Sequence, residues 1–281
     1  MTEGGHGPNE APPGDLVLYL ARRPSWTVRR EVGRIAASLP SGWRIAIISY
    51  RDEGPATERR VLVGARSVPW HIHDRTTIQA LPYPGKLRPQ TAEGWGIMPG
   101  NLDLLNLLAW RQEPPFSNLW VIEDDVRFTG RWSALFARLG AVEADVLSVG
   151  RRTLVSEPGW FWWSSLRDPD GNVFSDPGLV STFLPFHRIS AQAIAVIDAA
   201  YRAGWAGHHE VTWPTLALRA GLTIADIQSL PGKPVCTKES FRYRPPMEGP
   251  GDEPDMLWHP VKPPSRRVRL TNAARRLVGA G

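Results

Sequence analysis

Short apolar runs and longer amphipathic stretches alternate along the chain, and this pattern predicts strands interleaved with helices. The apolar runs have the length of buried strands and occupy residues 15–20, 44–49, 60–63, 119–122 and 145–149. Helical spacing of apolar residues predicts helices over 28–39, 101–110, 189–203 and 211–220, with a last short strand over 222–227. Strands that alternate with helices form a sheet covered on both faces, so we expect a Rossmann-like α/β fold with a mainly parallel sheet.

Composition divides the chain into three parts. Residues 1–13 are polar and glycine-rich and are predicted to form a disordered leader, followed by a single domain over 14–261. Residues 262–281 form a basic C-terminal tail, with six basic residues and no acidic one. Inside the domain, the proline- and glycine-rich segment 80–100 predicts a long loop, and loops of that length in compact domains are usually functional.

The formal net charge of +5 is concentrated in the tail, so the remainder of the chain is close to neutral. A nucleic-acid-binding groove would need basic residues in the body of the domain, and no nucleic-acid partner is expected. The tail suits peripheral contact with an anionic surface, such as phospholipid headgroups or a polyanionic protein. A solvated segment that improves solubility would have the same composition.

The chain has one cysteine, Cys236, so it cannot form an intrachain disulfide, which is typical of a reducing compartment. No apolar run approaches the roughly 18 residues of a membrane helix, and the first residues lack the apolar core of a signal peptide. These features predict a cytoplasmic protein.

Thirteen tryptophans are unusually many for 281 residues. Each is explained by core filling, because large aromatic side chains dominate the energetics of burial. The alternative is an open platform on which sugar rings or bases stack. The densest cluster, Trp160-Phe161-Trp162-Trp163, is the best candidate for such a platform.

The apolar run 119–122 ends in three consecutive carboxylates, Glu123, Asp124 and Asp125. Adjacent anions at a strand end repel one another, so a cation or water should lie beside them. A hard divalent cation such as Mg²⁺ or Mn²⁺ is commonly held by one or two carboxylates together with the phosphates of a substrate. The triplet could instead cap a following turn or pair with Arg127 and Arg131.

The strand followed by EDDV resembles the DXD motif of GT-A glycosyltransferases, in which an acidic pair coordinates the metal bound to a nucleotide-sugar diphosphate. Three further features occur in the order of that fold. Asp52 and Glu53 follow the second strand, where members contact the base or ribose, and Glu210 in GHHE resembles the catalytic carboxylate at a helix start. His259 in LWHP resembles the C-terminal histidine that completes the metal site.

The resemblance implies a metal-dependent, inverting transfer of a sugar from a nucleotide-diphosphate donor to an acceptor hydroxyl, with Mn²⁺ or Mg²⁺. Asp125 would be the main metal ligand, with Glu123 or Asp124 beside it and His259 completing the site. Glu210 would be the catalytic base. Contacts with the donor are expected from Asp52, Glu53, Arg22 and Asp124, and contacts with the acceptor from Trp160, Trp162, Trp163 and His209.

Two other functions use the same features. A nucleotidyl- or phosphoryl-transferase would apply the same carboxylate, metal and diphosphate chemistry, and an inactive protein of this fold would only bind carbohydrate. The sequence has no glycine-rich phosphate-binding loop of the P-loop or dinucleotide type, and no G-x-S-x-G motif of an α/β-hydrolase.

Overall fold

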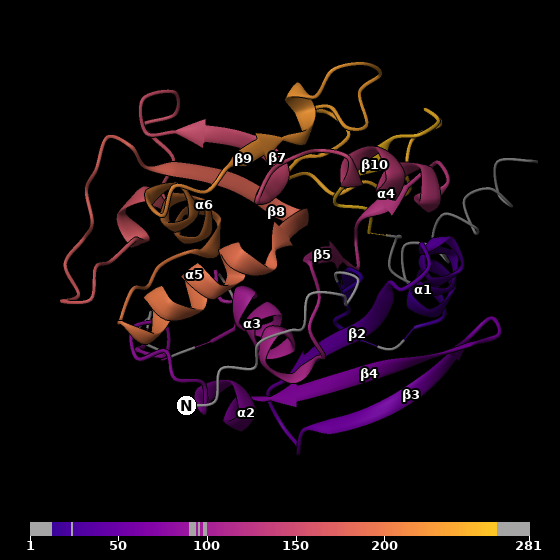
Figure 1. The fold of residues 1–281 in the computed structure, drawn as a ribbon, viewed down its shortest axis with the longest axis horizontal. Helices are drawn as coiled ribbons and strands as arrows, with labels where there is room; N and C mark the ends of the chain where they lie inside the picture. Colours follow the sequence, from indigo (N-terminus) through magenta and orange to yellow (C-terminus); the bar gives the residue numbers. More distant parts are fainter. Residues whose placement is uncertain (1–12, 24, 90–93, 95, 98–99, 263–281) are drawn as a thin grey trace, which may run out of the picture.

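The computed structural model describes residues 13–23, 25–89, 94, 96–97 and 100–262. Its core is an eight-stranded sheet with the strand order β3-β4-β2-β1-β5-β8-β7-β9 (Figure 1). The strands of this sheet are β1 (Leu16–Leu20), β2 (Arg44–Arg51), β3 (Thr57–Val63), β4 (Arg66–Asp74), β5 (Asn118–Glu123), β7 (Val146–Thr153), β8 (Val180–Ser190) and β9 (Ile224–Asp226). A second, two-stranded sheet pairs β6 (Arg127–Phe128) with β10 (Leu257–Trp258).

Helices cover both faces of the large sheet, as the sequence predicts. They are α1 (Trp26–Ser38), α2 (Arg75–Gln79), α3 (Asp103–Gln112), α4 (Trp132–Gly140), α5 (Ala191–Arg202) and α6 (His209–Arg219). Successive residues of β1 point to opposite faces, so Val17 and Tyr19 pack with α1 and α4, whereas Leu16 and Leu18 pack with α3, α5 and α6. The predicted α/β class is therefore confirmed.

Strands β4, β2, β1 and β5 run parallel to one another and form the half of the sheet that carries the acidic triplet. Strand β9 is parallel to β7, whereas β3 is antiparallel to β4, and β8 is antiparallel to both β5 and β7. The sheet is thus mainly parallel, with antiparallel pairing at β3 and around β8.

Strand β8 corrects the sequence prediction, which placed Ile189 at the start of a helix. Ile189 pairs with Leu119, and α5 begins only after Ser190, whose hydroxyl caps the helix by accepting from the backbone N–H of Ala193. The sequence does not predict this strand because Pro185 has no backbone N–H to donate to a sheet, and proline is rare inside strands. It is tolerated here because it lies where the pairing of β7 with β8 shifts register between Leu147 and Val149.

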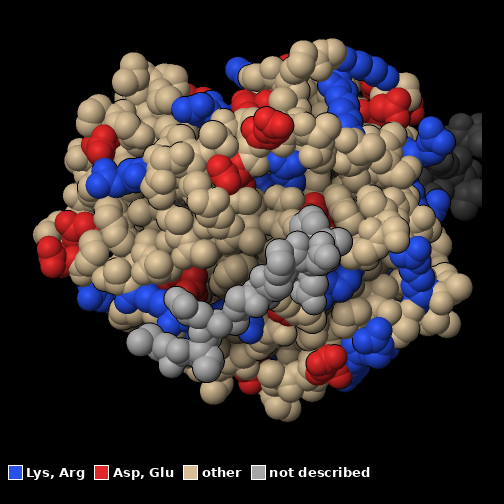
Figure 2. All heavy atoms as spheres, in the orientation of Figure 1, with Lys and Arg blue, Asp and Glu red and all other residues tan. Residues whose placement is uncertain are grey.

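Most of predicted leader 1–13 and the tail beyond Lys262 lie outside the described residues, so the proposed contact of the tail with an anionic surface stays a prediction. Acidic and basic side chains are interspersed over the face shown in Figure 2, in agreement with a nearly neutral domain. Among the described residues, no helix is long and apolar enough to cross a membrane.

Candidate active site

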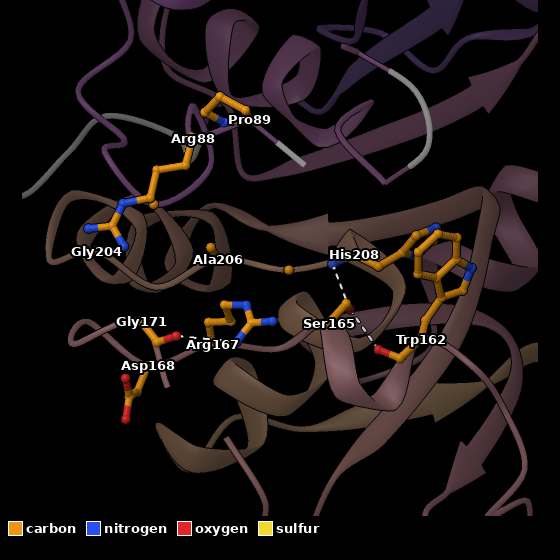
Figure 3. Close-up of a pocket in the computed structure, with 12 residues that line it drawn as sticks. Arg88, Pro89, Trp162, Ser165, Arg167, Asp168, Gly171, Gly204, Ala206 and His208 are labelled. Atoms are coloured by element: carbon orange, nitrogen blue, oxygen red, sulfur yellow. Dashed lines mark hydrogen bonds between the residues drawn. The ribbon is translucent and has the colours of Figure 1, made fainter. Parts of the chain in front are cut away.

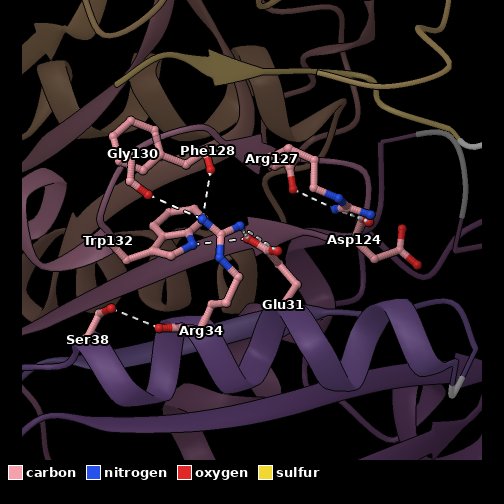
Figure 4. Close-up of polar contacts among 9 residues, drawn as sticks. Glu31, Arg34, Ser38, Asp124, Arg127, Phe128, Gly130 and Trp132 are labelled. Atoms are coloured by element: carbon pink, nitrogen blue, oxygen red, sulfur yellow. Dashed lines mark hydrogen bonds and ion pairs between the residues drawn. The ribbon is translucent and has the colours of Figure 1, made fainter. Parts of the chain in front are cut away.

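The acidic triplet lies at the carboxyl ends of the parallel strands, with Glu123 as the last residue of β5. The chain turns immediately, since the backbone N–H of Val126 donates to the Glu123 carbonyl at 3.0 Å. The Asp124 carboxylate accepts from the backbone N–H of Arg22, which follows β1, and its carbonyl accepts from Arg127 (Figure 4). Asp124 is therefore held toward β1, apart from the group that Glu123 and Asp125 form.

The two-stranded sheet brings the C-terminal part of the chain to this strand end. Trp258 of β10 pairs with Arg127 of β6, and the backbone N–H of Val261 donates to the Asp125 carbonyl at 2.8 Å. His259, between these two anchors, is buried with its Nε2 atom 3.3 Å from Oδ1 of Asp125. Ligand atoms of Glu123, Asp125 and His259 all lie within 4.8 Å of one another.

This group fits a divalent cation. The Nδ1 atom of His259 is 2.9 Å from the Arg242 carbonyl, to which it donates, so Nε2 of the neutral ring carries the free lone pair. Two electron-pair donors, Nε2 and the buried Oδ1 of Asp125, then face each other, and Oδ1 has no hydrogen-bond partner. Carboxylates with an imidazole suit Mn²⁺ and related cations.

The charges around Glu123 also favour a cation. The pKa of the Glu123 carboxyl is raised to about 8, mainly by burial and then by the negative charges of Asp125, Glu210 and Asp124, against the opposing charge of Lys262. Asp125 differs: burial raises its pKa, but a protonated His259 that donates to it and the charge of Lys262 outweigh burial and lower the pKa. Glu123 is thus the carboxylate whose charge is least compensated by protein.

Lys262 is a site residue that the sequence interpretation assigned to the basic tail. Its ammonium lies 3.4 Å from Oδ2 of Asp125, and 62% of its side chain is exposed. Composition alone groups Lys262 with the arginines that follow it. The position of Lys262 beside the acidic group becomes visible only in the structure, through the pairing of β6 with β10 and the hydrogen bond from Val261 to Asp125.

Glu210 lies in the first turn of α6, where the structure confirms a helix start. The N-cap is His208, whose Nδ1 accepts from the Glu210 backbone N–H at 3.3 Å. Burial raises the pKa of the half-buried Glu210 carboxyl to about 7, although Arg152 and a hydrogen bond from the Leu184 backbone oppose the shift. The Glu210 charge in turn raises the pKa of Glu123, which places the two carboxylates in one electrostatic environment.

A buried ion pair fixes the backbone on which α6 begins. The ammonium of Lys86 lies 3.1 Å from Oδ1 of Asp103, and neither side chain is exposed. Lys86 also donates to the carbonyls of Gly100 and Gly207, and Asp103 accepts hydrogen bonds from two aromatic side chains, Tyr201 and Trp213. Lys86 lies in the predicted loop 80–100, whose described part is therefore firmly anchored.

Beside the start of α6 lies a cavity of about 400 Å³. Its lining residues come from the segment 85–89, from the turn 162–171 and from the segment 204–208 that leads into α6 (Figure 3). Gly207 adopts a φ of +139°, and a Cβ there would lie 2.9 Å from the Ser165 carbonyl, so only glycine fits between these walls.

Of the predicted acceptor residues, only Trp162 lines this cavity. Trp162 lines it and stacks on His208, with ring centroids 4.6 Å apart. Trp163 is buried and donates to the Glu157 carbonyl, with Trp160 packed edge-on against it at 4.8 Å. His209 is buried and is not among the lining residues, so the histidine in the cavity wall is His208.

The predicted donor residues lie along the same edge of the sheet. Asp52 and Glu53 are exposed and directly follow β2, whose partner β1 pairs with β5. Asp52 accepts from Arg75 at 3.1 Å and from Tyr50 at 2.9 Å. Strand β1 lies between β2 and β5, which are therefore roughly 10 Å apart across the sheet. Glu123 is level with Leu20 and Ile48, so Asp52 and Glu53 also lie four and five residues farther along the strand direction.

No protein-family model matches the chain, and no curated protein sequence matches it. Among solved structures, the chain resembles galactosyltransferase LgtC in complex with donor and acceptor sugar analogues, with 10% identity, a TM-score of 0.40, and coverage of 76% of this chain and 74% of that one. It also resembles the Mn/GDP form of core-mannan synthase A from Aspergillus fumigatus, with 8% identity, a TM-score of 0.36, and coverage of 79% and 75%. A putative glucose-1-phosphate thymidylyltransferase from Bacillus anthracis, in complex with sucrose, has 10% identity, a TM-score of 0.36, and coverage of 76% and 86%.

The similarity concerns the arrangement of the sheet and its helices. The chemistry of this chain must come from its own side chains.

Proposed function

We propose that the protein is a metal-dependent glycosyltransferase that moves a sugar from a nucleotide-diphosphate donor to an acceptor hydroxyl with inversion at the anomeric carbon. One observation carries the proposal. The ligand atoms of Glu123, Asp125 and His259 converge at the end of a parallel strand, and the half-buried carboxyl of Glu210 shares their electrostatic environment. Ligands of parallel α/β sheets bind at this edge.

The residues then have separate roles. Glu123, Asp125 and His259 would hold Mn²⁺ or Mg²⁺, and the cation supplies positive charge to the departing diphosphate. Lys262, which already contacts Asp125, adds a second positive charge on the same side. Asp52, Glu53, Arg22 and Asp124 are proposed to contact the nucleotide along the sheet edge.

Glu210 is proposed to act as the general base. Its carboxylate takes the proton of the acceptor hydroxyl while the hydroxyl oxygen forms a bond to the anomeric carbon. The bond between that carbon and the diphosphate oxygen breaks, and the electron pair leaves with the nucleoside diphosphate. A pKa of about 7 suits this role, because the group is a base of useful strength near neutral pH.

The direct test is metal-dependent nucleotide binding by the full chain and by Asp125→Asn, measured by calorimetry with UDP or GDP in the presence of Mn²⁺ or EDTA. Asparagine keeps the shape of the side chain but removes the charge that a hard cation requires. We expect the wild type to bind only with Mn²⁺ and the variant to lose at least about tenfold in affinity. The matched control is Asp252→Asn, which changes an exposed carboxylate and should bind normally.

Two results would contradict the proposal. Nucleotide binding that ignores Mn²⁺ would remove the metal from the site and would favour a carbohydrate-binding protein. With donor and acceptor supplied, release of pyrophosphate in place of a nucleoside diphosphate would identify a nucleotidyltransferase.

A further inference from the structure

We propose that the cavity beside α6 binds the acceptor through an anionic group, a phosphate or a carboxylate, which Arg88 and Arg167 hold. This inference rests on the proposed transferase function and specifies its acceptor class. The sugar ring that carries the anion would lie against Trp162, with its reacting hydroxyl toward the first turn of α6.

Two guanidinium groups from distant parts of the chain converge on one turn. Arg167 donates from Nη1 to the Gly171 carbonyl at 3.2 Å. Nη1 of Arg88 lies 3.1 Å from the point where a side chain on Gly171 would begin. Both arginines line the cavity, and in Figure 3 Arg88 is drawn above the segment 204–208 and Arg167 below it. Like charges that approach in this way repel, and an anion between them would relieve the repulsion.

The protein itself supplies little compensation. Among the described residues, no ion pair includes Arg88 or Arg167. Asp168 also lines the cavity, but its carboxylate accepts from the Asn172 backbone N–H at 2.9 Å and shapes the turn. The cavity therefore carries an excess of positive charge. Guanidinium groups bind phosphate and carboxylate with paired, directional hydrogen bonds.

The remaining walls suit a sugar ring. Trp162 is held by its stacking on His208, and Ser165 ties the two together by accepting from the His208 backbone N–H and donating to the Trp162 carbonyl. A rigid aromatic side chain provides contact area at a small cost in conformational entropy. Elsewhere in the lining, Gly85 approaches the Gly204 carbonyl so closely that any side chain would clash.

The position of the cavity connects it to the proposed base. His208 is both a lining residue and the N-cap of α6, and its Nδ1 accepts from the backbone N–H of Glu210. An acceptor anchored by its anion at the arginines and by its ring at Trp162 therefore abuts the turn that carries Glu210. The charge of Glu210 also acts on Glu123, a proposed metal ligand at the end of β5.

The test compares glucose 6-phosphate, glucuronate and glucose as probes, by calorimetry at low ionic strength with the full chain. Charge-assisted hydrogen bonds to two guanidinium groups should make at least one anionic probe bind about tenfold more tightly than glucose. The relative affinity of the two anions distinguishes phosphate from carboxylate. The variant Arg88→Gln/Arg167→Gln should lose this preference, whereas Arg59→Gln, an exposed arginine of β3, is the control and should retain it.

Folding and donor binding are measured on the same variants. Arg88→Gln alone provides a second variant, because Arg88 forms no hydrogen bond or ion pair with other described residues and its loss should leave the melting temperature unchanged. Metal-dependent binding of UDP or GDP should be the same in all of them. Failure of the proposed function would appear as absent nucleotide binding, independent of the probes.

Three results would overturn the inference while nucleotide binding is intact. These are equal affinity for charged and neutral probes, a preference for the anions that survives the double substitution, and no saturable binding of either anion up to millimolar concentrations. A loss of the preference in Arg59→Gln equal to that in the double variant would overturn it too.

Discussion

Two groups of buried or half-buried charges meet at the start of α6, and they are balanced in opposite ways. In one, Lys86 and Asp103 are completely buried, lie 3.1 Å apart and use their remaining hydrogen-bonding groups on neighbouring carbonyls and aromatic side chains. In the other, the charges of Asp125 and Glu210 act on Glu123, and the cations that act on this group are the largely exposed Lys262 and, at Glu210, Arg152.

We interpret the difference as one between charges that maintain the fold and charges that are proposed to bind a ligand. A buried ion pair whose hydrogen-bonding groups already have partners is costly to break, but it leaves no group available to bind a substrate. Carboxylates with a raised pKa and an unpartnered oxygen are characteristic of functional sites. The first group should therefore respond to substitution through stability, and the second through binding and rate.

The largest effect is expected for Glu210→Gln. Removal of a general base typically lowers a rate by about 10² to 10⁴, while the donor and metal sites, which other residues form, should remain. The melting temperature should change little. Because the pKa of Glu210 is raised to about 7, the wild-type rate should increase as the pH rises through 7, and the variant should lose this dependence.

The measurement pairs transfer rate with donor affinity and melting temperature, and Glu143→Gln, an exposed glutamate after α4, is the control. A rate within a few-fold of wild type would remove Glu210 from catalysis. A product with retained anomeric configuration would exclude a single inverting displacement.

The reverse outcome is expected for Lys86→Met, which keeps the length of the side chain and leaves the buried Asp103 charge alone. Loss of one partner of a buried pair destabilises by about 3–5 kcal/mol. Denaturant unfolding measures this change in the free energy of unfolding. Lys233→Met removes an exposed lysine that lies 3.8 Å from the exposed Asp255, and it should cost at most about 1 kcal/mol.

A second substitution tests whether the effect arises from charge. Lys86→Met/Asp103→Asn should recover part of the lost stability, because the uncompensated carboxylate is gone. If Lys86→Met unfolds within about 1 kcal/mol of wild type, the ion pair does not maintain the start of α6.

The parallel half of the sheet could be predicted from the sequence, because β1, β2 and β5 are short uninterrupted apolar runs. Strand β8 could not, since it contains Pro185, His187 and Arg188. Arg188 is nevertheless buried, because its guanidinium donates to four carbonyls at and after the end of α4, and only the folded chain brings these together. Strand β4 was missed for the same kind of reason, as Pro69 interrupts its pattern.

For the candidate site, residue types were predictable and their partners were not. The acidic triplet, Glu210 and His259 follow from strand ends, a helix start and the GT-A resemblance. The turn that sends Asp124 toward Arg22 and leaves Asp125 facing His259 depends on backbone geometry after β5. The buried role of Lys86 could not be predicted, because a lysine in a proline- and glycine-rich segment is typical of an exposed loop.

The smallest effect is expected for Glu123→Gln, in the pH dependence of folding stability. This measurement tests whether the charge of the acidic group is left uncompensated by the protein. The pKa of Glu123 is raised from an ordinary value of 4.5 to about 8 in the folded chain, so between these values the folded form holds a proton that the unfolded form has lost. The stability that this proton contributes is fully present below pH 4.5 and is lost as the pH rises toward 8. Glutamine does not titrate, so the variant should lose less stability over this window and should exceed the wild type in stability near pH 8. Melting temperatures in EDTA from pH 5 to pH 8 test this, and Mn²⁺ should raise the wild-type value most at the alkaline end, because a cation favours the ionised carboxylate. Asp125→Asn should show no such gain, since the pKa of Asp125 is lowered, so this carboxyl is ionised throughout the window. Parallel curves for the wild type and Glu123→Gln would show that Glu123 is ionised without a cation and that the acidic group is balanced by the protein alone.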